Sequence, residues 1–96
     1  MPSMERIEAE LFTDASNNAV IKVPGRRFPG VLIQGDSLSA LRADVAQIVA
    51  ACAEGDLDEA RGWGDLVLSH LDGLLDRYCA ALSEHEIPLP FSRPDA

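Results

Sequence analysis

The chain has 96 residues, 47% of them apolar and 25% charged, which is typical of one small globular domain and excludes an intrinsically disordered chain. No apolar run approaches the ~20 residues that span a bilayer, and the N-terminus lacks the basic and apolar regions of a secretory signal. We therefore expect a cytoplasmic protein without a membrane segment. The net charge is −8, and residues 54–96 alone carry ten acidic and three basic residues. This acidity disfavours nucleic-acid binding and favours a protein partner with a basic surface.

Three short strands are predicted in the first third of the chain. Residues 5–13 alternate apolar side chains with glutamates, which is the pattern of a half-buried strand, and residues 14–18 predict a hairpin loop. Residues 19–23 are rich in β-branched side chains and form the second strand, which Pro24-Gly25 ends. The uniformly apolar residues 31–33 predict a third strand that is covered on both faces or lies centrally in the sheet.

Two helices are predicted after the strands. Apolar residues recur at helical spacing from a cap at Asp36 or Ser37 as far as Ala53. Gly55 then supplies a helix C-terminus and Asp56 the N-cap of a second helix, which reaches Ser83 or Glu84. Because the connection is so short, the two helices should form an antiparallel hairpin.

These elements predict an α+β fold, β-β-β-α-α, in which a three-stranded antiparallel sheet packs against an antiparallel two-helix hairpin. We expect one domain over residues 1–86 and a proline-rich tail over residues 87–96. The second helix overshoots the first by about two turns. Its overshooting part carries Leu75, Tyr78 and Leu82, which either pack against the sheet and tail of the same chain or form the self-association surface of a homodimer.

The residues of an enzyme or a metal site are not recognisable in this sequence. His70 and His85 are the only histidines, and neither has a metal-ligand spacing. Asp72 and Asp76 share a helix face and are interpreted as solvated acids. The GxSxG, GxGxxG and P-loop motifs are missing. The sequence therefore predicts a non-catalytic protein without metal or cofactor.

Arg26-Arg27-Phe28 is the best exposed candidate for a binding site. Two guanidiniums beside an aromatic ring can recognise a carboxylate, a phosphate or a stacked base. The alternative is a solvated loop with Phe28 tucked against the sheet edge and one arginine paired with a local acid. Gln34 and Asp36 follow the next strand and are added to the predicted partner- or ligand-binding set, although strand-end hydrogen bonding and helix capping also explain them.

Three further side chains on the helices are candidates for packing or binding. Cys52 and Cys79 fall on apolar positions of the two helices, too far apart in an antiparallel hairpin for an intramolecular disulfide. The sole tryptophan, Trp63, lies between two glycines and either covers the core or anchors an interface.

The segment FPGVLIQGDSL, residues 28–38, resembles the signature of HicB-type antitoxins, and the resemblance spans roughly residues 5–53. It implies a β-β-β-α arrangement in which the helix covers a small sheet. The sequence departs from that family where a fourth strand is expected, and it lacks the family's DNA-binding extension. The whole chain more closely resembles a family of short bacterial proteins of unknown function.

Together these features predict a non-catalytic cytoplasmic protein-binding module, antitoxin-like or immunity-like, that occludes a basic partner. The alternative is a small-ligand or RNA-binding accessory protein that uses Arg26, Arg27 and Phe28 as an anion and stacking site.

Overall fold

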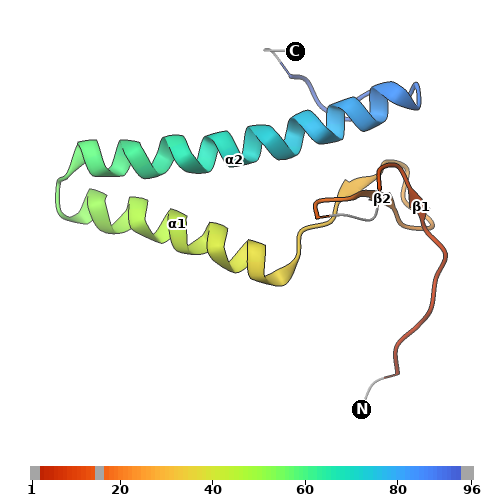
Figure 1. Cartoon of the computed structure of the whole chain (residues 1–96), viewed down its shortest axis with the longest axis horizontal. Coiled ribbons are helices and arrows are strands. Elements are labelled where there is room, and N and C mark those ends of the chain that lie inside the picture. Colours follow the sequence, from red (N-terminus) through yellow and green to blue (C-terminus); the bar gives the residue numbers. More distant parts are fainter. Residues whose placement is uncertain (1–2, 15–16, 94–96) are drawn as a thin grey trace. The chain divides into compact units, whose positions relative to one another are not determined.

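A computed structural model describes residues 3–14 and 17–93 and confirms the predicted α+β class (Figure 1). The order of elements is the predicted one: β1 (Glu10–Leu11), β2 (Val20–Lys22), β3 (Gly30–Val31), α1 (Gly35–Ala53) and α2 (Leu57–Glu84). The chain forms two compact units: unit 1 consists of Met1–Leu32 and Arg77–Ala96, and unit 2 of Ile33–Asp76. Residues 15–16 of the predicted hairpin loop and residues 94–96 of the tail lie outside the described residues.

The sheet of unit 1 has the order β1-β2-β3, and both strand pairs are antiparallel. The first strand is much shorter than the predicted residues 5–13, because its partner ends. Glu10 lies opposite Lys22, the last residue of β2. Gly25, with φ +85°, then turns the chain away, so residues before Glu10 have no strand to pair with.

The third strand is also different from the prediction, since β3 is an edge strand and is not covered on both faces. Only Gly30–Val31 pairs with β2, and Leu32 is exposed. Successive strand residues point to opposite faces of a sheet. Val31 accordingly packs towards the core, whereas Leu32 lies on the outer side. Val31 and Leu32 of this apolar run therefore lie on opposite faces of the sheet.

The core of unit 1 joins the sheet to the C-terminal part of α2. Val20 and Leu82 are fully buried, and Tyr78 is 5% exposed. Around them lie four partly buried residues from the loop after β1, from β3 and from the tail: Phe12, Val31, Ile87 and Leu89. The overshooting end of α2 thus packs within its own chain. Tyr78 and Leu82 are core residues, and the self-association surface predicted on them is corrected accordingly; of the three predicted residues only Leu75 is exposed.

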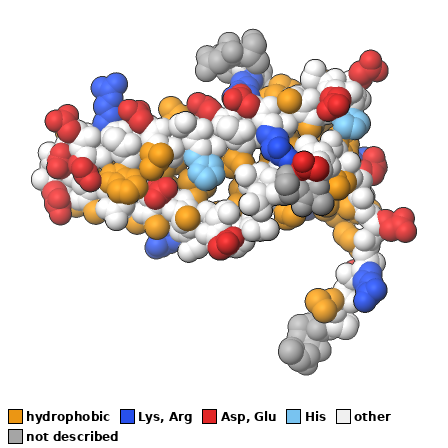
Figure 2. Space-filling model, in the orientation of Figure 1, with side chains coloured by type: hydrophobic (Ala, Val, Ile, Leu, Met, Phe, Trp, Pro, Cys, Tyr) orange, Lys and Arg blue, Asp and Glu red, His pale blue; other side chains and the backbone are white. Residues whose placement is uncertain are grey.

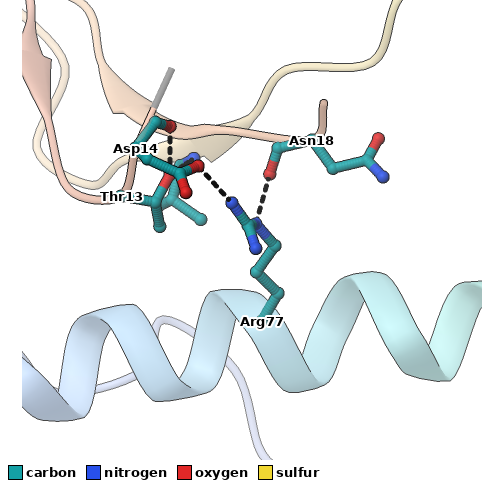
Figure 3. A network of polar contacts seen from close by, with 5 residues as sticks. Thr13, Asp14, Asn18 and Arg77 are labelled. Atoms are coloured by element: carbon teal, nitrogen blue, oxygen red, sulfur yellow. Dashed lines mark hydrogen bonds and ion pairs between the residues drawn. The ribbon is translucent and has the colours of Figure 1, made fainter. Parts of the chain in front are cut away.

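Arg77 ties the loop between β1 and β2 to α2 (Figure 3). Its Nε donates a hydrogen bond to the carbonyl oxygen of Asn18 at 3.0 Å, and its Nη2 donates to Oδ1 of Asp14 at 3.1 Å. On the same loop, the hydroxyl of Thr13 accepts a hydrogen bond from the N–H of Val20 at 3.1 Å. Asn18 has φ +62°, a conformation that asparagine tolerates better than most residues. Thr13, Asp14 and Asn18 of this loop are therefore held by hydrogen bonds.

The end of α2 carries the tail back onto unit 1. Glu86 has φ +57°, and the N–H of Ile87 donates to the carbonyl oxygen of Leu82 at 2.9 Å, as in a Schellman motif. Further along, Phe91 stacks on Tyr78 with ring centroids 5.9 Å apart. Ile87, Leu89 and Phe91 of the proline-rich tail thus pack on unit 1.

In unit 2, the helices α1 and α2 run antiparallel from a three-residue connection, as predicted (Figure 1). Gly55, with φ +72°, donates its N–H to the carbonyl oxygen of Cys52 at 3.1 Å, and Asp56 donates to that of Ala51 at 2.9 Å. These two bonds form a Schellman motif that ends α1. The side chain of Asp56 accepts the N–H of Glu59 at 3.1 Å, which confirms it as the N-cap of α2.

Candidate functional site

The predicted Arg-Arg-Phe corner lies beside an open groove on unit 1. The corner begins with a tight turn in which the N–H of Arg26 donates to the carbonyl oxygen of Val23 at 3.1 Å. The groove has a volume of about 310 Å³ and is lined by β2, the corner and β3: Ile21, Val23, Arg26, Phe28, Pro29, Gly30, Val31 and Leu32. Its lining is mostly apolar, with one guanidinium at the side. This composition suits a ligand that has both an apolar part and an anionic group.

A buried hydrogen bond fixes the corner to the core. The hydroxyl of Tyr78 donates to the carbonyl oxygen of Pro29 at 2.8 Å. Burial raises the pKa of Tyr78, and the charge of the neighbouring Cys79 thiolate raises it further. The phenol therefore stays protonated and keeps donating this bond at neutral pH. Neither residue was predicted to act here, because they are 49 positions apart in the sequence.

The three corner residues differ in what they offer a ligand. The guanidinium carbon of Arg27 lies 5.3 Å from the centroid of the Phe28 ring, within the range of a cation–π contact. Phe28 is half-buried and lines the groove. Arg26 lines the groove and forms no ion pair with the other residues that the structure describes. Arg26 is therefore the cation best placed to meet a bound anion.

Gln34 and Asp36, which were predicted to join this site, begin α1 and do not line the groove. Gln34 is the N-cap residue, and its carbonyl oxygen accepts the N–H of Leu38 at 2.9 Å. Asp36 lies in the first turn, where a negative charge stabilises a helix, and it accepts the N–H of Ser37 at 2.8 Å. The helix thus begins at Gly35, earlier than the predicted cap at Asp36 or Ser37.

The helical hairpin of unit 2 exposes an apolar surface that the sequence analysis did not single out. We call this surface the hairpin face, and it consists of Leu38, Val45, Val49, Leu68 and Leu75. Val49 is 65% exposed and Leu68 is 58% exposed. Acidic side chains gather where α1 and α2 are joined (Figure 2).

Helix geometry places the members of the hairpin face on one side of the hairpin. Each follows a less exposed residue, as Val49 follows Ile48 and Leu68 follows Val67. One step along a helix turns a side chain by about 100°. Because the two helices run in opposite directions, this turn brings both sets of side chains to the same side. The periodicity in the sequence could have revealed this second stripe beside the inward-facing one.

The face is interrupted and bordered by charged residues. Arg42 and Arg61 lie at helical spacing among its members. Asp65 and Asp72 each come one residue after the inward-facing stripe of α2, as Leu68 and Leu75 do, and so lie on the same side of the helix. The connection and the first turn of α2 add four exposed acids: Glu54, Asp56, Asp58 and Glu59. An apolar surface with an acidic border fits a partner whose apolar patch is bordered by basic residues.

The remaining candidates line neither the groove nor the hairpin face. The indole N–H of half-buried Trp63 donates to Oε1 of Glu59 at 3.0 Å. Both cysteines are free, and Cys79 accepts a hydrogen bond from Nη1 of Arg93 at 3.5 Å. In residues 3–14 and 17–93, His, Cys, Asp and Glu form no group of three that could hold a metal ion. His70 is exposed and belongs to no such group within the described part of the chain.

Comparison with known proteins assigns the chain to a family. The model of a family of unknown function, DUF6959, matches residues 4–91. The chain belongs to this family. The match includes all the strands and helices described above, so the family model covers both units. No curated protein and no solved structure matches the chain. Over the part of the chain that the structure describes, no helix is long and apolar enough to cross a membrane.

Proposed function

We propose that this DUF6959 protein is a non-catalytic protein-binding module of the cytoplasm, which binds a partner through the hairpin face. The exposed apolar side chains of α1 and α2 are the observation that carries the proposal. Soluble proteins rarely leave several large aliphatic side chains of one face in water, and such faces usually mark interaction sites. The free cysteines suit a reducing compartment.

The charge of unit 2 indicates the chemistry of the partner. Residues 33–76 carry nine acidic and two basic residues. A basic partner would be attracted by this charge and held by burial of the apolar face. An antitoxin-like or immunity-like inhibitor would act in this way, by covering a basic functional surface of its partner. The resemblance of residues 5–53 to HicB-type antitoxins supports this class.

Affinity purification from native cells tests the proposal when three forms of the full chain are compared. Val45→Glu places a charge on the hairpin face. Gln47→Glu adds the same charge to an exposed residue on the other side of α1. We expect the wild type and Gln47→Glu to retain a stoichiometric partner with a basic surface, and Val45→Glu to lose it. Circular dichroism checks that each variant is folded. A partner that Val45→Glu retains would show that binding does not use the hairpin face.

The groove favours a second candidate function, the binding of a small anionic ligand. Arg26 offers an unpaired cation beside an apolar lining, within the residues that the structure describes. RNA suits the groove less well, because the chain has a net charge of −8 and Arg27 already covers one side of Phe28. Recovery of a metabolite or RNA that Arg26→Ala and Arg27→Ala abolish would support this candidate over the protein-binding module.

A further inference from the structure

The N-terminal segment has the pattern of a strand but has no partner strand in its own chain. Residues 3–9 are all exposed and lead away from the sheet (Figure 1). Met4 is 95% exposed and Ile7 is 56% exposed. In an extended segment, Glu5, Ile7 and Ala9 share one face. We call residues 4–9 the N-terminal arm. The face that Glu5, Ile7 and Ala9 share has two apolar side chains and one carboxylate.

The groove beside β3 offers the complementary features. Its lining is apolar, and it contains Arg26, for which the described residues provide no acidic partner. β3 pairs only with β2, so the described sheet leaves the other edge of β3 open. Open strand edges bind extended segments through backbone hydrogen bonds, while side pockets select the side chains. The groove therefore fits an extended apolar segment with a carboxylate.

From this complementarity we infer that the N-terminal arm of a second copy of this chain occupies the groove. Ile7 enters the apolar lining, and the carboxylate of Glu5 pairs with Arg26. The six residues of the arm span about 20 Å when extended, enough to follow β3 and the corner. The exchange is reciprocal in a two-fold dimer, so that both arms and both grooves are filled. This interface uses unit 1 and is separate from the hairpin face.

Sedimentation of the full chain over a range of concentrations tests the inference. We expect a dimer for the wild type. Ile7→Glu should weaken it by about tenfold or more, because a charge replaces a buried aliphatic side chain. Glu5→Arg and Arg26→Glu should each weaken the dimer, and the double variant that exchanges both charges should restore it. Glu8→Arg is the matched control, since it makes the same charge change on the opposite face of the arm.

Three results would overturn the inference. The first is a wild type that stays monomeric at every accessible concentration. The second is a dimer that Ile7→Glu leaves intact or that Val45→Glu dissociates, since either would place the contact elsewhere. The third is a Glu8→Arg variant whose dimer is weakened as much as that of Glu5→Arg, which would indicate a general effect of charge. Because Glu5, Ile7 and Glu8 are exposed in the single chain, their variants should fold normally.

Discussion

The hydrogen bond from Tyr78 to Pro29 should be one of the larger single contributions to the stability of unit 1. Tyr78→Phe keeps the ring and removes only the hydroxyl, so the buried carbonyl oxygen of Pro29 loses its donor. A buried polar group without its partner costs about 1–3 kcal/mol. For a domain of this size the total free energy of unfolding is about 5–14 kcal/mol. We therefore expect Tyr78→Phe to lower the stability by about 1.5 kcal/mol, or roughly 6–12 °C in Tm.

Urea unfolding followed by circular dichroism measures this loss at neutral pH. Phe91→Leu is the control, because it removes the ring that stacks on Tyr78 and leaves the hydrogen bond intact. The control should cost less than Tyr78→Phe, since Phe91 is partly exposed. Equal stability of Tyr78→Phe and the wild type would show that the phenol does not hold the corner.

The same residue predicts a pH dependence. The pKa of Tyr78 is raised above 10.0, first by burial and then by the charge of the Cys79 thiolate. The unfolded chain therefore releases the phenol proton before the folded chain does, and stability falls as pH rises above 10.0. Because Tyr78 is the sole tyrosine, its phenolate absorbance reports this titration directly. A titration at 10.0 in the folded protein would mean that the phenol is hydrated. Tyr78→Phe should lose this group's share of the pH dependence.

Four further substitutions test the packing, the turns and the loop by urea unfolding. Leu82→Ala empties a fully buried site and should cost about 3 kcal/mol; a loss under about 1 kcal/mol would contradict the assigned core. Glu86→Gly should stabilise by about 1 kcal/mol because φ is +57°, whereas Gly55→Ala at φ +72° should destabilise by a similar amount; changes of the opposite sign would contradict the two turns. Arg77→Met removes the hydrogen bond to Asn18 and should cost about 1 kcal/mol, with faster amide exchange in residues 17–20; unchanged exchange would mean that Arg77 does not hold the loop.

The sequence predicts the local parts of this fold well, because they depend on short-range physical chemistry. Gly55 and Asp56 end one helix and begin the next, and both roles are confirmed. The end of α2 at Glu84 also agrees. The left-handed conformation of Glu86 was not predicted, because an ordinary residue is strained there and the hydrogen bonds of the turn enforce it.

The candidate site was only partly predictable. Arg26 and Phe28 lie together because they share one tight corner, which the Pro-Gly pairs indicate. Gln34 and Asp36 are close in sequence but serve the start of α1. The contact of Arg77 with Asn18 joins residues 59 positions apart, and no local pattern encodes such a contact. The hairpin face was overlooked because each helix has two adjacent apolar stripes, and periodicity alone does not tell which stripe meets the other helix.

Unit 1 is assembled from the two ends of the chain, which has a consequence for the order of folding. Its sheet is synthesised first, but the helix residues that cover Val20 come from beyond position 76. Unit 2 is continuous and helical, so its contacts are local and form quickly. During translation the hairpin can form while the sheet still lacks its cover. The short strands, two or three residues each, therefore become stable only when the last segment of the chain packs on them. Truncation of that segment should remove the sheet and leave helical structure.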